Sequence, residues 1–403
     1  MFALTSISRW AIIAAVAVPF FTGCGQPEPA RFHLNMVHAV KNKISPKKQQ
    51  EVANLLTALF GTPDDPYLPP ELQADGGLDI NLVRRAAGPV GSDVSRKKNG
   101  LYREHCVHCH GISGDGMGTT AAFLNPYPRD YRPGLYKFKS TSSDTPVRPT
   151  HDDLMRTLVE GLPGSSMPSF RLLPDQDREA LVEYVKYLTV RGETELALYQ
   201  MVNDEFPGED ESLPQDQETI VALARTNVDK WINSLAQTIE PPTPPANFGT
   251  AESIALGRAA FFDAKKGNCT SCHGTTALGD GQLIVKDEWS KSVVEARTVA
   301  GEGTENPDTA ALALIDQFSL PVRFLQPRNL RNGIYRGGRR PLDIYYRVHA
   351  GIQGSGMSGA TAEATPDERW AIVDYVLSLP YEPGGALRFD PHAEQAAPVK
   401  ETN

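Results

Sequence analysis

Two short motifs constrain this chain more than any other feature, because each gathers two cysteines and a histidine into five consecutive residues. The motifs are "CVHCHG", with Cys106, Cys109 and His110, and "CTSCHG", with Cys269, Cys272 and His273. A cysteine pair of this spacing followed by histidine arises by chance in roughly one chain in a thousand. Two copies therefore indicate a bound group, and the candidates are a zinc ion, a thiol–disulfide couple and a covalently attached haem.

Both motifs lie inside a repeated unit. "LYREHCVHCHGISGDG" (101–116) corresponds to "FFDAKKGNCTSCHGTTALGDG" (261–281), which makes the two Gly-Asp-Gly triplets equivalent. "PRDYRPGLYK" (128–137) corresponds to "PRNLRNGIYR" (327–336), "EGLPGSSMP" (160–168) to "AGIQGSGMS" (350–358), and the helical pattern of 178–188 to that of 369–379. Four elements in the same order indicate duplication of a domain.

The copies differ in length at one place. About 36 more residues separate the cysteine motif from the "PR" element in the second copy, and this surplus falls at about 285–320. It is either a surface excursion over the second site or a contact with a partner, and the sequence leaves both alternatives open.

The repeat divides the chain into segments. We expect a signal peptide at 1–23, an N-terminal helical or spacer segment at 24–93, a first domain at 94–190, an acidic, helical and Pro-rich linker at 191–249, a second domain at 250–382 and a tail at 383–403. Within the N-terminal segment, Val52, Leu55, Leu56 and Leu59 share one face of a predicted amphipathic helix.

The charge balance excludes one class of partner. The chain has 49 Asp+Glu against 40 Lys+Arg, and no basic stretch has the density of a nucleic-acid footprint. We therefore expect no nucleic-acid partner.

The N-terminal sequence predicts export. The apolar run from Trp10 to Phe21 is too short to span a bilayer, which takes about 20 residues, but it suits a signal peptide. "FTGC" resembles the bacterial lipoprotein signal, in which Cys24 is lipidated and becomes the new N-terminus. We expect a lipoprotein anchored to a membrane on the periplasmic side. The alternative is an ordinary signal peptide, with Cys24 spare or removed.

The flanks of the motifs favour haem over the other two groups. Zinc needs four ligands, and each unit supplies two thiolates and one histidine. A thioredoxin-type pair should follow a strand, whereas these flanks read as helix and Gly-rich loop. Two cysteines at this spacing can each form a thioether to a haem vinyl group, and one helical turn places the histidine under the iron. The sequence thus predicts two covalent haem c groups, with His110 and His273 as proximal ligands.

A methionine at equivalent repeat positions predicts the second axial ligand. Met167 in "GSSMPS" and Met357 in "GSGMSG" have glycines around them that let the chain pass close to the haem face, and a Met thioether raises the potential of haem iron. Among the rivals, Met117 is too close to the first motif and Met155 lies on a predicted helix. His349 leaves a bis-histidine alternative open for the second site.

Each repeat, at 94–190 and 250–382, resembles a class I cytochrome c domain, with an N-terminal helix, "CxxCHG", a loop, a methionine loop and a C-terminal helix. The resemblance implies a mainly α fold made of two tandem small helical domains. The family often braces the proximal histidine with a proline carbonyl, for which Pro126 or Pro128 and Pro327 are candidates. Arg129 and Arg328 are possible contacts of the haem propionates. The alternative, of equal weight, is that both are surface arginines.

His/Met ligation fills both axial positions and leaves no open site for a substrate. The resemblance therefore implies a dihaem c-type cytochrome that passes single electrons between membrane-associated respiratory or dehydrogenase complexes and a terminal acceptor, with redox proteins as partners. The alternative is a dihaem peroxidase, which needs one labile axial ligand and a distal acid–base residue.

His105 and His108 have no counterpart in the second motif, so we expect that neither is needed to hold the iron.

Overall fold

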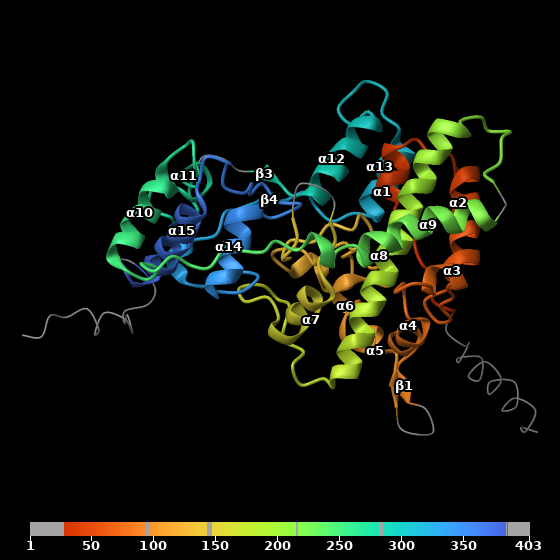
Figure 1. Cartoon of the computed structure of the whole chain (residues 1–403). Helices are drawn as coiled ribbons and strands as arrows, with labels where there is room; N and C mark the ends of the chain where they lie inside the picture. Colours follow the sequence, from red (N-terminus) through yellow and green to blue (C-terminus); the bar gives the residue numbers. More distant parts are fainter. Residues whose placement is uncertain are drawn as a thin grey trace, which may run out of the picture.

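The computed structural model describes residues 28–92, 97–142, 147–214, 217–281, 285–383 and 385. The predicted signal peptide, Cys24 and nearly all of the predicted tail lie outside the described residues. The described part is mainly helical, with two short antiparallel strand pairs, so the predicted mainly α fold class is confirmed. Figure 1 shows the second domain, with α10, α11, α14 and α15, beside a larger body that holds α1 to α9.

The N-terminal segment is packed against the first domain and is not a free spacer. Its helices are α1 (Met36–Lys41), α2 (Pro46–Phe60), α3 (Pro70–Gln73) and α4 (Ile80–Ala86). The Ser45 side chain accepts a hydrogen bond from the Lys48 amide, which caps α2 with a proline in its first turn. The predicted face of α2 buries Val52, Leu56 and Leu59, and this helix and α4 both pack on α8.

The first domain surrounds the first cysteine motif. It comprises β1 (Gly91–Ser92), β2 (Lys98–Asn99), α5 (Leu101–His105), α6 (Val107–His110), η2 (Ala121–Phe123), α7 (His151–Glu160) and α8 (Asp175–Glu205). α8 runs 31 residues, so the expected domain boundary at 190 falls inside it, and its second half packs on α9 (Gln217–Ile232). Gly192 lies mid-helix, where it costs about 1 kcal/mol relative to Ala. A Cβ there would overlap the backbone of Arg132, so the glycine lets that loop lie directly on α8.

The second domain has its own core. After η3 (Leu235–Gln237) it comprises α10 (Ala251–Phe262), α11 (Thr270–His273), β3 (Val285–Lys286), α12 (Glu288–Val299), α13 (Thr309–Gln317), β4 (Phe324–Leu325), η4 (Leu330–Asn332), α14 (Pro341–Ala350), α15 (Pro366–Ser378) and η5 (Leu379–Tyr381). α10 packs along α15, around Phe261, Trp370 and Ile372. A capping box of Thr365 and Glu368 starts α15.

The insertion of the second domain contacts the N-terminal segment of the same chain. α12 and α13 enclose a small core with α1, in which Val37 packs against Val293 and Ile315 (Figure 1). Lys41 on α1 forms an ion pair with Glu295 on α12 at 2.5 Å. The insertion therefore covers α1 and joins the second domain to the N-terminal segment.

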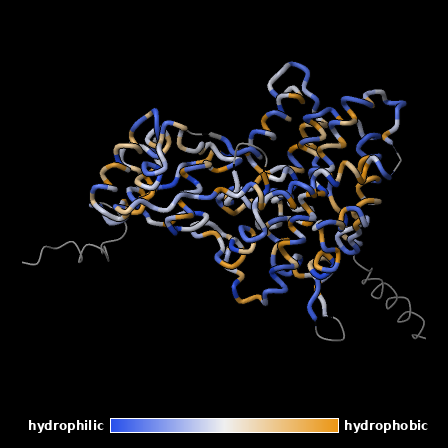
Figure 2. The backbone as a smooth tube through the Cα atoms, viewed as in Figure 1, coloured by the Kyte–Doolittle hydropathy of each residue, from blue (hydrophilic) through white to orange (hydrophobic). Residues whose placement is uncertain are grey.

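Apolar residues alternate with polar ones along the helices in Figure 2. Within the part of the chain that the structure describes, no helix combines the length and the apolar content needed to cross a membrane.

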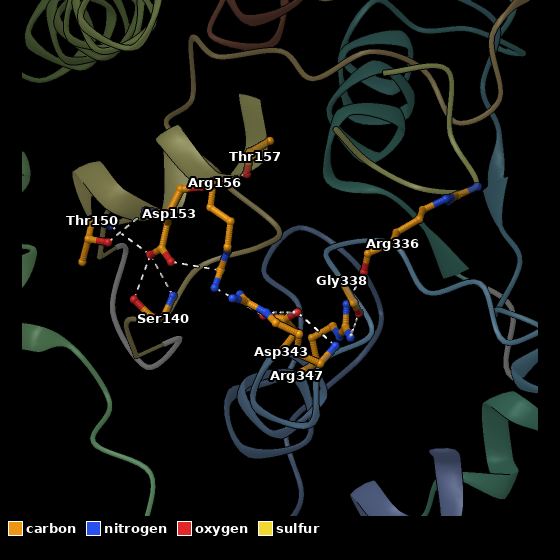
Figure 3. A network of polar contacts seen from close by, with 10 residues as sticks. Ser140, Thr150, Asp153, Arg156, Thr157, Arg336, Gly338, Asp343 and Arg347 are labelled. Atoms are coloured by element: carbon orange, nitrogen blue, oxygen red, sulfur yellow. Dashed lines mark hydrogen bonds and ion pairs between the residues drawn. The ribbon is translucent and has the colours of Figure 1, made fainter. Parts of the chain in front are cut away.

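A polar network joins the two domains at the start of α7 and α14, which are equivalent helices in the repeat (Figure 3). Asp153 and Asp343 each cap their own helix by accepting from the backbone amide three residues earlier, that of Thr150 or Arg340. Arg156 on α7 bridges them, with Nη2 at 3.2 Å from Asp153 and Nη1 at 3.3 Å from Asp343. Arg156 is thus a direct link between the helices that lead into the two methionine loops.

We expect Arg156→Leu to lower the free energy of unfolding by about 1–3 kcal/mol, the range for a lost charge-assisted hydrogen bond. Both aspartates keep other partners, Asp153 with Ser140 and Asp343 with Arg340, so the chain should still fold. Urea titration followed by circular dichroism measures the change. Arg171→Leu, at an exposed position, is the control and should shift stability by less than about 0.5 kcal/mol. Equal effects of the two variants would refute the link.

Candidate functional site

Each cysteine motif forms a single helical turn. In the first, the His110 amide donates to the Cys106 carbonyl at 2.9 Å, and in the second the His273 amide donates to the Cys269 carbonyl at 2.8 Å. This turn brings both cysteines and the histidine of each motif to one side of the backbone. Cys106 is buried, and the other three cysteines are half-buried.

The proximal histidines are held in the same way in both domains. Nδ1 of His110 lies 3.0 Å from the carbonyl oxygen of Arg129, and Nδ1 of His273 lies 3.0 Å from that of Arg328. A carbonyl oxygen only accepts, so Nδ1 carries the proton and Nε2 keeps a lone pair for a metal. Burial lowers the pKa of His110 to about 4 and also lowers that of His273. Both imidazoles are therefore neutral near pH 7.

The expectation that a proline carbonyl braces each histidine is wrong by one residue. The bracing carbonyl belongs to the arginine that follows Pro128 or Pro327, and Pro126 does not supply it either. The Pro128 carbonyl instead faces Gly116, where a Cβ would lie 2.7 Å from it, and the Pro327 carbonyl faces Gly279. Both glycines have positive φ, a conformation that favours glycine, and each lies against a proline carbonyl. The carbonyl of the arginine that follows each proline is turned toward the histidine.

The backbones of the two Gly-Asp-Gly triplets are not in register in the structure, although both aspartate carboxylates lie against the glycine that follows the histidine, Gly111 or Gly274. Gly116 and Gly279 donate to the carbonyls of His110 and His273, each at 2.9 Å. Gly116 ends the first triplet, whereas Gly279 begins the second, so the sequence alignment there is displaced by two residues. These two backbone hydrogen bonds therefore define which loop residues are equivalent, counted from the histidine. The positions of the aspartates in the sequence do not.

The methionine loops share one hydrogen-bond framework. The Leu162 amide donates to the Met167 carbonyl at 3.1 Å, and the Ile352 amide to the Met357 carbonyl at 2.9 Å. In each loop a serine hydroxyl, two residues before the methionine, accepts from the methionine amide, at 3.3 and 3.2 Å. The repeat inferred from sequence thus extends to these loops in detail.

The second site is a cavity of about 310 Å³. Its lining includes Cys269, Cys272, His273 and Met357, together with the apolar side chains of Phe261, Leu330, Ile344, Val348, Ile352, Ile372 and Val376. The structure therefore brings the predicted thioether, proximal and distal residues of the second site to one cavity. His349 is not among the lining residues; its ring stacks on Tyr345, with centroids 5.8 Å apart.

The charged residues of this cavity are all cationic. Lys137, Arg328, Arg336 and Arg347 line it, and no Asp or Glu in the described part of the chain belongs to the lining. An apolar cavity with a histidine, a methionine, two thiols and four cations matches a haem, which is an apolar disc with two carboxylates. Sequence reasoning missed Lys137, Arg336 and Arg347. The sequence did contain a signal for two of them, because Lys137 and Arg336 are cations at the same position of the repeat.

In the first domain, the motif and the methionine loop border a common core. Cys106 belongs to this core and Met167 packs against it half-buried. Tyr131 stacks on the His110 ring with centroids 4.7 Å apart, and its repeat counterpart, Leu330, lines the second cavity. Arg129 faces a smaller cavity of about 140 Å³, next to Asp130.

The geometry does not favour zinc or thiol redox chemistry. Burial, with a smaller contribution from the neighbouring cysteine, raises the pKa of Cys106 and of Cys269 to about 12, whereas reactive thiols have lowered values. The four described cysteines are not paired in disulfides. The described residues contain no group of three or more His, Cys, Asp and Glu arranged to hold a metal ion.

Comparison with known proteins agrees with this geometry. The family model for cytochrome c matches residues 99–189 and 254–380, together more than half of the chain. The chain belongs to the cytochrome c family. Membership implies covalently bound haem c and supports a haem-based role in electron transfer.

Among solved structures, the chain is similar to one from the reducing HAO-like protein complex of Kuenenia stuttgartiensis. The two are 23% identical, with a TM-score of 0.46, and the match covers 70% of this chain and 94% of the other. A search of curated proteins finds no match.

Proposed function

We propose that the chain is a dihaem cytochrome that carries single electrons, with one haem c held by each domain. Cys106, Cys109, Cys269 and Cys272 would form the thioethers, and His110, Met167, His273 and Met357 would ligate the two irons. Haem iron supplies the chemistry, by cycling between the ferric and ferrous states. The protein's residues hold each histidine neutral, present a thioether from the other side and keep the site apolar.

The observation that carries this proposal is the shared lining of the second cavity by His273 and Met357. If His273 and Met357 both ligate the iron of a haem bound there, no position would be left on it for a substrate. The cavity also adjoins the first methionine loop, because Arg328 and Arg336 donate to the Gly164 carbonyl at 3.3 and 3.2 Å. Gly164 lies three residues before Met167, so the two sites are neighbours and an electron can pass between them within one chain.

The peroxidase alternative needs a residue that displaces Met357 and a distal acid or base. The insertion was the candidate source of such a residue. It packs on α1 instead, and no residue of α12 or α13 lines the second cavity. Among the described residues, His273 is the only one that brings an imidazole to the cavity lining. These observations favour the carrier.

Export, a lipid anchor at Cys24 and a periplasmic location form part of the same proposal. One support is the apolar run followed by "FTGC". The other is that covalent attachment of haem c takes place outside the bacterial cytoplasm. The partners would then be respiratory or dehydrogenase complexes at the membrane and a terminal acceptor, met one electron at a time.

Visible and near-infrared spectra of the purified protein test this function. We expect two low-spin haems per chain, with the weak near-infrared band of Met–Fe(III) ligation in the oxidised form, and no turnover of hydrogen peroxide with a reduced cytochrome as donor. A stoichiometric high-spin haem in the oxidised or half-reduced protein, together with peroxide turnover, would contradict the carrier and favour the peroxidase.

A further inference from the structure

The lining of the second cavity includes two residues from the first domain, Lys137 and Phe138. We propose that the Lys137 ammonium binds a propionate carboxylate of the haem in the second domain, so that both domains build the second haem site. This inference rests on the proposed function, because it requires a haem at that site.

Packing between the domains positions Lys137. Its neighbour Phe138 lies directly on the backbone of the second domain, where a Cβ added at Gly337 would overlap the aromatic ring. Gly337 has φ +80°, a conformation that favours glycine. The close approach of these backbones carries Lys137 to the cavity wall.

The Lys137 amino group has no ion-pair partner among the residues that the structure describes. Its side chain is half-buried and has no hydrogen bond or ion pair with any residue in the described ranges. Its pKa is lowered to about 7, mainly by burial and to a smaller extent by Arg129 and Arg336, and only Asp287 acts in the opposite direction. An anion placed against the ammonium would offset this cost, and a propionate carboxylate is the anion that a haem in the cavity would bring.

The other cations of the cavity already have partners. Arg328 and Arg336 donate to the carbonyl of Gly164, as described above. Arg347 donates to the carbonyls of Arg336 and Gly338, the second at 2.6 Å. These bonds to uncharged carbonyls hold the three arginines in place, whereas Lys137 donates to no residue in the described ranges and is the lining residue whose amino group is left for a ligand.

The interface between the two domains contains two equivalent contacts, related by an approximate two-fold axis. A Cβ at Gly164 would meet Ile334 at 2.9 Å and Arg328 at 3.2 Å. At the equivalent Gly354, it would approach Arg129 and Leu135, the counterparts of Arg328 and Ile334, at 3.7 and 3.9 Å. Each methionine loop therefore faces the "PR" segment of the other domain, as in an isologous contact. Lys137 and Arg336, which occupy the same repeat position, both point to this shared interface.

A positive charge beside a haem favours the ferrous state, which is less positive by one charge. Removing the charge at position 137 should therefore lower the midpoint potential of the second haem. The size of the effect is limited by solvent, since the side chain is only half-buried.

Potentiometric titration of the holoprotein tests the proposal with Lys137→Met, Lys137→Arg and Lys265→Met. For Lys137→Met, we expect the reduction equilibrium constant of one haem to fall by about threefold to tenfold, a shift of ~30–60 mV for one electron. Lys137→Arg should keep the potential. Lys265→Met makes the same change in net charge at an exposed position of the second domain and should leave both potentials in place.

The shifted haem is identified by combining Lys137→Met with Met357→Leu, which marks the second haem spectroscopically. A shift of the first haem alone, or equal shifts in Lys137→Met and Lys265→Met, would overturn the assignment. Unchanged potentials in Lys137→Met, with two low-spin haems present, would overturn it as well. A haemochromogen assay that counts fewer than two haems in the unaltered chain would instead contradict the proposed function.

Discussion

Replacement of both Cys269 and Cys272 by serine is expected to leave one covalent haem per chain in place of two. Serine cannot form the thioethers, and no other thiol of the described residues lines the second cavity. The cavity has a volume of about 310 Å³ and an apolar wall. Without the haem, this apolar wall would lie against water, which is unfavourable. The second domain should therefore lose stability together with its haem.

Haem staining of the denatured chain, the haemochromogen spectrum and intact mass measure this outcome. Ser271→Ala lies between the same two cysteines, at a half-buried position, and is the control that should keep both haems. The first domain has a separate core, so its low-spin spectrum should persist in the double serine variant. Two covalent haems in that variant would rule out the second motif as an attachment site.

Replacement of Met357 by leucine is expected to change the second haem more than any other single substitution that keeps it bound. Leucine conserves volume within the cavity, so the cost in packing should stay below about 1.5 kcal/mol. It removes the thioether, so the near-infrared band of that haem should disappear and a high-spin signal should appear. Axial ligands and their surroundings tune haem over about 0.8 V, and we expect the potential to fall on the order of 100 mV or more.

Met167→Leu should produce the same change in the first haem, and the double variant should lose the near-infrared band completely. Met155→Leu, on α7, is the matched control and should alter neither haem. If Met357→Leu leaves the spectrum unchanged, then the methionine assignment is wrong for the second site. A spectrum of two histidine ligands would then favour His349.

The sequence could single out the two cysteine motifs as candidate attachment sites because their chemistry is local. Cys106, Cys109 and His110 lie on one helical turn, and the backbone hydrogen bond from His110 to Cys106 spans four residues. The methionine loops were predictable because duplication placed Met167 and Met357 in register. In both cases the information lies within a short segment or in a comparison of two segments, so no tertiary contact was needed.

The partners of these residues were less predictable, because they come from distant parts of the chain. The carbonyl that braces His273 is 55 residues away, and sequence reasoning placed it one residue too early. α8 continues past residue 190, where its second half packs on α9 and Thr194 accepts a hydrogen bond from Asn227. The partner of the insertion was also undetermined, since its small apolar face matches α1 only after both segments have folded.

The sequence by itself indicated the class of protein and predicted two haem motifs, each with a histidine and a methionine as ligands, because these predictions depend on residue type and short spacing. Only the tertiary structure decided that the domains face each other through their methionine loops and that Lys137 of one domain lines the cavity of the other. Such contacts join residues more than a hundred positions apart. They depend on the relative placement of two separately folded cores, which no local pattern encodes.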